Sequence, residues 1–133
     1  MPKNKSKGSK SERELFQKFI DSGVYRAVRV AGSGTMENAD CDIIAGRIVK
    51  KGSKYGIEVK ASKKPSKYIS KDQMNRFMVF CAIFELKPVI ALRFDREGWF
   101  FIHPKTMREC GKSWVITLEE AKNKGKRFSQ FFK

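Results

Sequence analysis

The stretch YGIEVK, residues 55–60, alternates apolar and polar side chains with a period of two. This alternation predicts a β-strand that buries one face and presents Glu58 and Lys60 on the other, roughly 7 Å apart. An acid and a base side by side are unusual in a core strand. Asp42 adds a second acid at the start of the preceding apolar run DIIAG, residues 42–46. Two carboxylates beside an ammonium can hold a hard divalent cation, an arrangement suited to phosphodiester hydrolysis.

Hydrophobic periodicity around this strand predicts one α/β domain, residues 9–124, with a mixed central sheet of about five strands flanked by helices. The predicted elements are a helix from Ser9 to Gly23, strands at 24–30, 42–49 and 55–60, a helix at 70–84, strands at 88–94, 99–103 and 114–116, and a short final helix from Thr117. In the first strand, Val24, Val28 and Val30 share one face.

Glu12 has two interpretations from the residues alone. The sequence SKSE, residues 9–12, has the form of a capping box that starts a helix, with Glu12 as its acid. Helical spacing also puts Glu12 on the face of Leu15 and Phe19, where it can point toward the polar edge of the core. Spacing by itself favours the cap.

The chain of 133 residues carries 29 lysines and arginines against 14 acids, a net charge of +15 at pH 7. This excess indicates a polyanionic partner, and nucleic acid is the first candidate. A ribosomal or chromatin protein would carry the same charge, whereas the even spread of basic residues disfavours a membrane surface. The segment MPKNKSKG, residues 1–8, is expected to be a flexible arm that contacts DNA. The lysines that we expect to contact DNA are Lys5, Lys7, Lys10, Lys63 and Lys64.

The remaining composition points to a soluble, cytoplasmic protein. No apolar run is long enough to cross a membrane, and no apolar segment follows the lysine-rich start. Cys41, Cys81 and Cys110 are odd in number and widely spaced, which indicates neither a disulfide framework nor a zinc site. His103, the only histidine, is expected to be structural.

Five blocks follow one another in a recognisable order: GSKSEREL (8–15), RVAGSG (29–34), DIIAG (42–46), IEVK (57–60) and Tyr68-Ile69-Ser70 before a helix. Together they resemble the archaeal-type Holliday junction resolvases, members of the PD-(D/E)xK nuclease superfamily. The resemblance covers residues from about 8 to 104 and implies a restriction-endonuclease-like core. It also implies a two-fold homodimer that resolves four-way DNA junctions in recombination and repair, by paired symmetric nicks that depend on a metal.

The resemblance assigns roles to the acids and the lysine already singled out. Asp42, Glu58 and the backbone carbonyl of Val59 would bind Mg²⁺, or Mn²⁺ as a substitute, because these ions prefer oxygen ligands. Glu12 matches the acid of the family's first helix and would complete the metal site. Lys60 would orient or deprotonate the attacking water and stabilise negative charge in the transition state.

The same resemblance assigns further residues to the site. Arg13 and Arg29 match family arginines that serve the site or bind phosphate, which suits the bidentate geometry of a guanidinium group. Ser33 matches a loop serine that is important for cleavage. Cys41 stands where many members have a proline, which shapes the approach to the metal without binding it. Asp40 is a rival ligand, but Asp42 is favoured because it directly precedes the apolar strand.

Two regions are candidates for contacts with protein partners. The aromatic run Trp99-Phe100-Phe101 and the helix Met74–Phe84 are candidates for the dimer interface. The tail, residues 125–133, contains FSQFF and resembles a sliding-clamp binding motif through its phenylalanines, Phe128, Phe131 and Phe132. Gly125 stands where that motif has glutamine, so a terminal helix or tail packed on the domain is at least as good an interpretation.

Two rival functions remain open from the sequence. The first is another endonuclease of the same fold, of restriction or repair type, which would cut linear duplex as fast as junctions. The second is an architectural DNA-binding protein without catalytic activity, which would bind junctions and cut none.

Overall fold

The computed structural model describes residues 2–30, 40–48 and 53–133, and in the first helix it describes side chains from Lys10 onward. In chain order the elements are α1 (Pro2–Asp21), β1 (Tyr25–Arg29), β2 (Ile43–Arg47), β3 (Lys54–Ser62), β4 (Ser66–Ser70), α2 (Lys71–Ile83), β5 (Lys87–Phe94), β6 (Gly98–Ile102), the 3-10 helix η1 (Pro104–Thr106), β7 (Arg108–Cys110), β8 (Ser113–Thr117), α3 (Leu118–Lys124) and α4 (Phe128–Phe131). No helix in these ranges is both long and apolar enough to cross a membrane.

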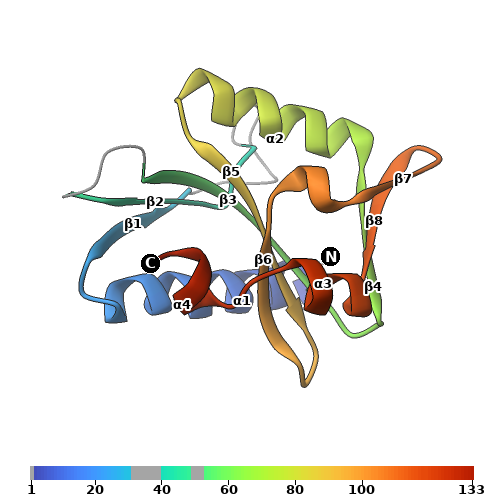
Figure 1. Cartoon of the computed structure of the whole chain (residues 1–133), viewed down its shortest axis with the longest axis horizontal. Coiled ribbons are helices and arrows are strands. Elements are labelled where there is room, and N and C mark those ends of the chain that lie inside the picture. The colour runs from blue at the N-terminus through green and yellow to red at the C-terminus, as the bar shows by residue number, and fades with distance from the viewer. Residues whose placement is uncertain (1, 31–39, 49–52) are drawn as a thin grey trace.

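A five-stranded sheet forms the centre of the fold, in the order β1-β2-β3-β5-β6. Strands β3 and β5 run parallel, whereas the other neighbouring strands run antiparallel, so the sheet is mixed. Helix α1 lies on one side of the sheet and α2 on the other (Figure 1). The predicted α/β class, with a mixed central sheet flanked by helices, is therefore confirmed.

The internal strand β5 separates two hydrophobic cores. Val89 and Ala91 pack on the α1 side of the sheet, and Ile90 and Leu92 pack on the α2 side with Phe77. Burial on both faces explains why the sequence of β5 is almost continuously apolar. Strand β3, which carries Glu58, lies directly beside β5, so its polar residues lie at the border of a well-packed core.

A second, three-stranded sheet in the order β4-β8-β7 lies beside the first. The sequence predicts only its strand at 114–116, because β4 and β7 are short and lack a clear alternation of apolar residues. Strand β4 matters for the site, since it leads from β3 directly into α2. Ser70 at the end of β4 is the N-cap of α2 and accepts a hydrogen bond from the backbone N–H of Gln73 at 3.0 Å, which confirms the predicted start of this helix.

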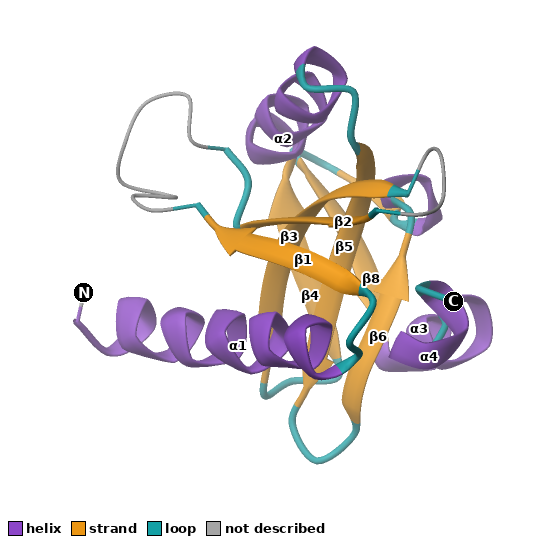
Figure 2. Ribbon diagram, turned by 90° about the vertical axis from the view of Figure 1, so that its left-hand side faces the viewer, coloured by secondary structure: helices purple, strands orange, loops and turns teal. Residues whose placement is uncertain are grey.

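Helix α1 begins at Pro2, not at Ser9. The predicted capping box is therefore wrong, since both Ser9 and Glu12 lie inside a continuous helix. The predicted arm, residues 1–8, is helical from Pro2 onward, and α1 extends past the edge of the sheet (Figure 2). A proline is well suited to the first turn of a helix, which explains why the helix can start there. Contact between this segment and DNA stays a prediction.

The valines of β1 suggest that their face of the strand packs on the core. In the structure the opposite face does so. Val28 is 57% exposed, whereas Tyr25 is buried. The ring of Tyr25 packs edge to face against Phe19 and Phe132, and its hydroxyl donates to the carbonyl of Phe132 at 2.9 Å. A large aromatic ring buries more apolar area than a valine, so it decides the orientation of this edge strand.

The aromatic run in β6 is internal. Trp99, Phe100 and Phe101 are all buried, with Phe100 in the core on the α2 side and its two neighbours in the core on the α1 side. The prediction that these residues form an exposed dimer interface is therefore wrong. The run is apolar because β6, like β5, is covered on both faces.

The tail packs on the domain and contributes to its core. Phe132 is 4% exposed, and its ring lies 4.8 Å from that of Phe19 and 5.1 Å from that of Phe101. Phe128 and Phe131 pack against the same cluster. The interpretation of residues 125–133 as a packed tail is thus confirmed, and a contact with a sliding clamp stays a prediction.

Candidate active site

Asp42 is held rigidly where β1, β2 and β3 meet. Its backbone N–H donates to the carbonyl of Ile57 at 3.0 Å, and its own carbonyl accepts from the N–H of Val30 at 2.9 Å. Its carboxylate oxygen Oδ2 accepts from the N–H of Val59 at 2.8 Å. Asp42 as a whole is only 7% exposed. Asp42 is therefore fixed by three backbone hydrogen bonds, one of them to its functional group.

Glu58 lies on the next strand and is buried to the same degree, with 7% of the residue exposed. The ammonium of Lys60 lies 3.5 Å from its Oε2 atom, so the predicted placement of these two side chains on one face of β3 is confirmed, although this face is covered at Glu58. The side-chain amide of Gln73, from the first turn of α2, donates to the same oxygen at 2.9 Å. The carboxylate of Glu58 thus contacts one side chain from its own strand, Lys60, and one from helix α2, Gln73.

Burial and like charge make the metal-free pair of acids unfavourable. Burial and then the charge of Asp42 raise the pKa of Glu58 to about 8, while Lys60 works in the opposite direction. The site therefore holds more negative charge than its one lysine offsets when both acids are ionised. A divalent cation would relieve this repulsion, and carboxylate oxygens are ligands that Mg²⁺ and Mn²⁺ accept. The chemistry of the donor set thus fits the implied metal.

The backbone carbonyl of Val59 lies on the correct side of the strand to join these acids. The N–H and C=O of one residue project toward the same neighbouring strand, and the N–H of Val59 is bound to Asp42. The ladder between β2 and β3 runs from Ile43 opposite Ile57 toward the other end of β3, so Val59 lies beyond it. Its carbonyl therefore faces the site of Asp42.

Glu12 reaches the edge of this site but has another partner. Its Oε1 atom lies 3.4 Å from the guanidinium of Arg29 on β1. Burial and then the charge of Asp42 raise the pKa of Glu12, so the two acids influence each other. Yet within the described ranges no three acidic, histidine or cysteine side chains gather as a metal-ligand group. Direct metal binding by Glu12 stays a prediction.

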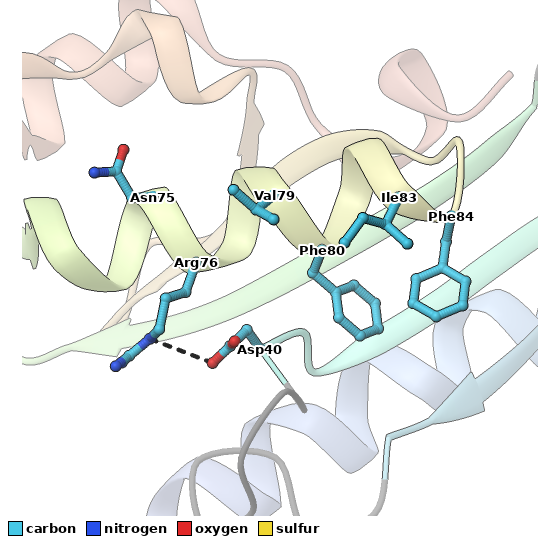
Figure 3. Close-up of a pocket in the computed structure, with 7 residues that line it drawn as sticks. All are labelled: Asp40, Asn75, Arg76, Val79, Phe80, Ile83 and Phe84. Carbon is cyan, nitrogen blue, oxygen red and sulfur yellow. Dashed lines mark ion pairs between the residues drawn. The ribbon is translucent and has the colours of Figure 1, made fainter.

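Asp40 has an ion-pair partner on α2. Its carboxylate pairs with Arg76 of α2 at 3.4 Å, and Arg76 also contacts Asp72 at 3.0 Å. Figure 3 shows Arg76 reaching from α2 to Asp40 on the segment that leads into β2. The geometry therefore favours Asp42 over its rival as the partner of Glu58. Cys41, at the position where many members have proline, is fully buried and its thiol donates to the carbonyl of Ile43 at 3.2 Å.

The other predicted residues surround the site to different extents. Lys10 and Arg13 lie on α1 near Glu12, while Lys63 and Lys64 are exposed in the turn between β3 and β4. Ser33 lies outside the described residues, and so do the side chains of Lys5 and Lys7.

Sequence reasoning missed Gln73. The pattern Ser70-x-x-Gln73 predicts a capping box, which already accounts for a glutamine at that position without any role in the site. The only signal was topological, since just one short strand, β4, separates the strand that carries Glu58 from the first turn of α2.

Comparison with known proteins agrees with this geometry. The sequence model of the family described as archaeal Holliday junction resolvase (Hjc) matches residues 3–133. The crossover junction endodeoxyribonuclease Hjc of Archaeoglobus fulgidus is 33% identical over 136 residues, covering 96% of this chain and 96% of that protein. The protein of the same name from Methanocaldococcus jannaschii is 36% identical over 110 residues, covering 83% of this chain and 75% of that one.

The fold agrees with a solved structure as well. The structure of Archaeoglobus fulgidus Hjc, described as a Holliday junction resolvase from an archaeal hyperthermophile, superimposes with a TM-score of 0.79 and 28% identity. The match covers 90% of this chain and 93% of that one. With a paired-acid site in the expected place and a match over nearly its whole length, the chain belongs to the archaeal Holliday junction resolvase family.

Proposed function

We propose that this protein is an endodeoxyribonuclease that resolves four-way DNA junctions by paired, symmetric, metal-dependent nicks. The observation that carries the proposal is the buried pair Asp42 and Glu58 with Lys60 beside it, in a chain that matches crossover junction endodeoxyribonucleases over most of its length. The proposed products are a 5′-phosphate and a 3′-hydroxyl. The site of action would be DNA in an archaeal cell, or in one infected by a virus.

Asp42, Glu58 and the carbonyl of Val59 would hold the metal, with Mg²⁺ proposed and Mn²⁺ as a substitute. When bound, the ion supplies Lewis-acid chemistry and makes water a better nucleophile. Lys60 orients the attacking water or takes its proton, and its ammonium stabilises the charge that gathers on the phosphate oxygens. Glu12, held by Arg29 at 3.4 Å, completes the acidic edge of the site.

The basic residues near the site would bind the phosphates on either side of the cut. Arg13 and Arg29 suit this role because a guanidinium can make two parallel hydrogen bonds to phosphate oxygens. The exposed Lys63 and Lys64 extend the basic surface past the end of β3. Such contacts read no sequence, so selectivity for branched DNA would come from junction shape and deformability.

Two symmetric nicks need two copies of the site, and α2 offers a surface for a two-fold dimer. Ile83 and Phe84 are 69% and 56% exposed, and Phe80 packs against Phe84 with ring centroids 4.8 Å apart. Figure 3 shows the rings of Phe80 and Phe84 on the same side of α2, beside the ion pair of Arg76 with Asp40. An exposed apolar centre with a charged rim is typical of a protein interface. A two-fold axis here would make the patch contact its own copy.

The decisive experiment compares the wild-type protein with Asp42→Asn on a labelled four-way junction whose arms cannot migrate. With Mg²⁺, the wild type should produce two symmetric nicks, and the variant should bind the junction and make none. Cleavage that survives in the variant would refute the assignment of the site. Equally fast cutting of linear duplex by the wild type would favour a restriction or repair enzyme, and binding without any cutting would favour an architectural protein.

The predicted contact between the tail and a sliding clamp would require a change in this fold. Phe132 is buried against Phe19 and Phe101, so it could enter a clamp only after leaving the core. Clamp capture that is lost when residues 128–133 are removed would support the contact. Unchanged capture would remove it.

A further inference from the structure

Gln73 departs from the usual geometry of its position. It is the third residue of α2, and its backbone N–H donates to the N-cap Ser70 at 3.0 Å. In a complete capping box the side chain of the third residue bonds back to the N-cap N–H, as Glu120 does to Thr117 at the start of α3, at 2.9 Å. The side chain of Gln73 instead donates to Oε2 of Glu58 at 2.9 Å. The side chain of Gln73 thus contacts the site instead of bonding back to the start of its helix.

We propose that Gln73 is a positioning residue that holds the carboxylate of Glu58 in the orientation needed to bind the metal, an inference that rests on the proposed nuclease function. Among the described residues, the donors recorded for this carboxylate are Gln73 and Lys60, and both reach Oε2. With Oε2 held by these two donors, Oε1 would be the oxygen left to bind the metal. Substituting a residue that orients a metal ligand typically weakens metal binding by about 10- to 100-fold.

A neutral amide is chemically suited to this role. Glu58 is buried beside Asp42, so its carboxylate needs a hydrogen-bond donor to replace lost water. A second lysine or an arginine would also donate, but its charge would offset the acid and repel the incoming cation. A glutamine amide donates without adding charge, so it orients the ligand and leaves the negative charge of the site available to the metal.

The position of Gln73 is rigid because two elements fix the start of α2. The N–H of Lys71 donates to the carbonyl of Lys112 at 2.8 Å, and Ser70 pairs with Ser113 in the second sheet. The first turn of α2 is therefore attached to β8 and its preceding turn. The second sheet, through α2, thus acquires a function in the site: it keeps the donor to Glu58 in register.

The test measures Mn²⁺ binding to the full chain by calorimetry, without DNA, for Gln73→Met and for the matched control Gln17→Met. Gln17 lies on the exposed surface of α1 and bonds only locally, to Asp21 at 2.8 Å. We expect Gln73→Met to weaken Mn²⁺ binding by about 10-fold and Gln17→Met to leave it unchanged. Gln73→Ala, which keeps a strong helix former, provides a second variant in case methionine packs badly.

A purely structural role for Gln73 predicts a different result. It would lower the melting temperature of both Gln73 variants and leave their Mn²⁺ affinity equal to that of the wild type, which would overturn the inference. Glu58→Gln separates this outcome from a failure of the proposed function. If Glu58→Gln abolishes Mn²⁺ binding and folded Gln73 variants bind normally, only the positioning role is refuted. If Glu58→Gln itself binds normally, the metal site is refuted, and the positioning role with it.

Discussion

At the scale of single residues, the fold disfavours the ionised form of the Glu58 carboxyl group. Burial and then Asp42 raise its pKa from 4.5 to about 8. Between these two pH values the folded chain keeps a proton that the unfolded chain has lost. Stability therefore falls as the pH rises through this window, with a slope of up to about 1.4 kcal/mol per pH unit for one proton.

We therefore predict that the metal-free protein unfolds at a lower temperature at pH 8 than at pH 5.5, and that Glu58→Gln reduces this difference. The substitution removes the titrating group but keeps its size and its capacity for hydrogen bonds. Thermal unfolding in the presence of a chelator, followed by circular dichroism across this pH range, measures the effect. The raised pKa of Glu12 acts in the same direction, so part of the slope should survive in the variant. An identical slope in both proteins would contradict the electrostatic account of the site.

The residues that the sequence alone could identify are those whose chemistry conflicts with their pattern. Glu58 and Lys60 stand out because a strand beside the core has no structural use for a buried acid and an ammonium. Gln73 could not be identified, because a helix cap explains it equally well and its contact with Glu58 depends on how α2 packs. The direct partner of Glu12 was missed for the same reason, since Arg29 comes from a different element.

At the scale of secondary-structure elements, strong periodicity predicted the core and failed at the edges. β5 and α2 were located correctly, because their apolar residues are numerous and regularly spaced. The valines that share one face of the edge strand β1 do not reveal which face is buried, since the packing of Tyr25 turns the opposite face to the core. The start of α1 was misplaced, because a capping-box pattern inside a helix cannot be distinguished from one at its beginning.

Helix α4 illustrates how a terminal element can be part of the core. We predict that Phe132→Ala destabilises the protein by about 3 kcal/mol, a typical cost for removing a buried phenylalanine ring. Its ring packs against Phe19 and Phe101, and its carbonyl accepts from the hydroxyl of Tyr25. Chemical denaturation measures the change. The control Tyr68→Ala, at an exposed aromatic on β4, should stay within about 0.5 kcal/mol of the wild type.

A free tail would give another result. If residues 128–133 spent most of their time detached, Phe132→Ala would be as mild as Tyr68→Ala. That outcome would also mean that the tail is available to bind a partner such as a sliding clamp. The expected large loss would mean that any such partner must compete with the hydrophobic core for the same phenylalanines.

At the scale of the whole molecule, the net charge of +15 and the one buried acid pair of the described residues have to be considered together. One chain can make one nick at a time, whereas resolution needs two nicks related by the symmetry of the junction. A two-fold dimer through the exposed face of α2 would present two sites and about twice the basic charge to one DNA molecule. Its binding should be tight and should weaken steeply as salt is added.

We therefore predict that Ile83→Glu converts the protein from a dimer to a monomer. A carboxylate at the centre of this apolar face would be buried without a partner in the dimer, which costs several kcal/mol per copy. Analytical ultracentrifugation should show the mass halved, and the salt dependence of junction binding should fall to about half its wild-type slope, because one chain neutralises fewer phosphates. The nicks should then appear one at a time, with singly cut junctions accumulating.

Val24→Glu, at an exposed valine outside α2, is the matched control and should remain dimeric. A dimeric Ile83→Glu variant that still makes coupled nicks would mean that the two-fold axis passes through another face of the molecule.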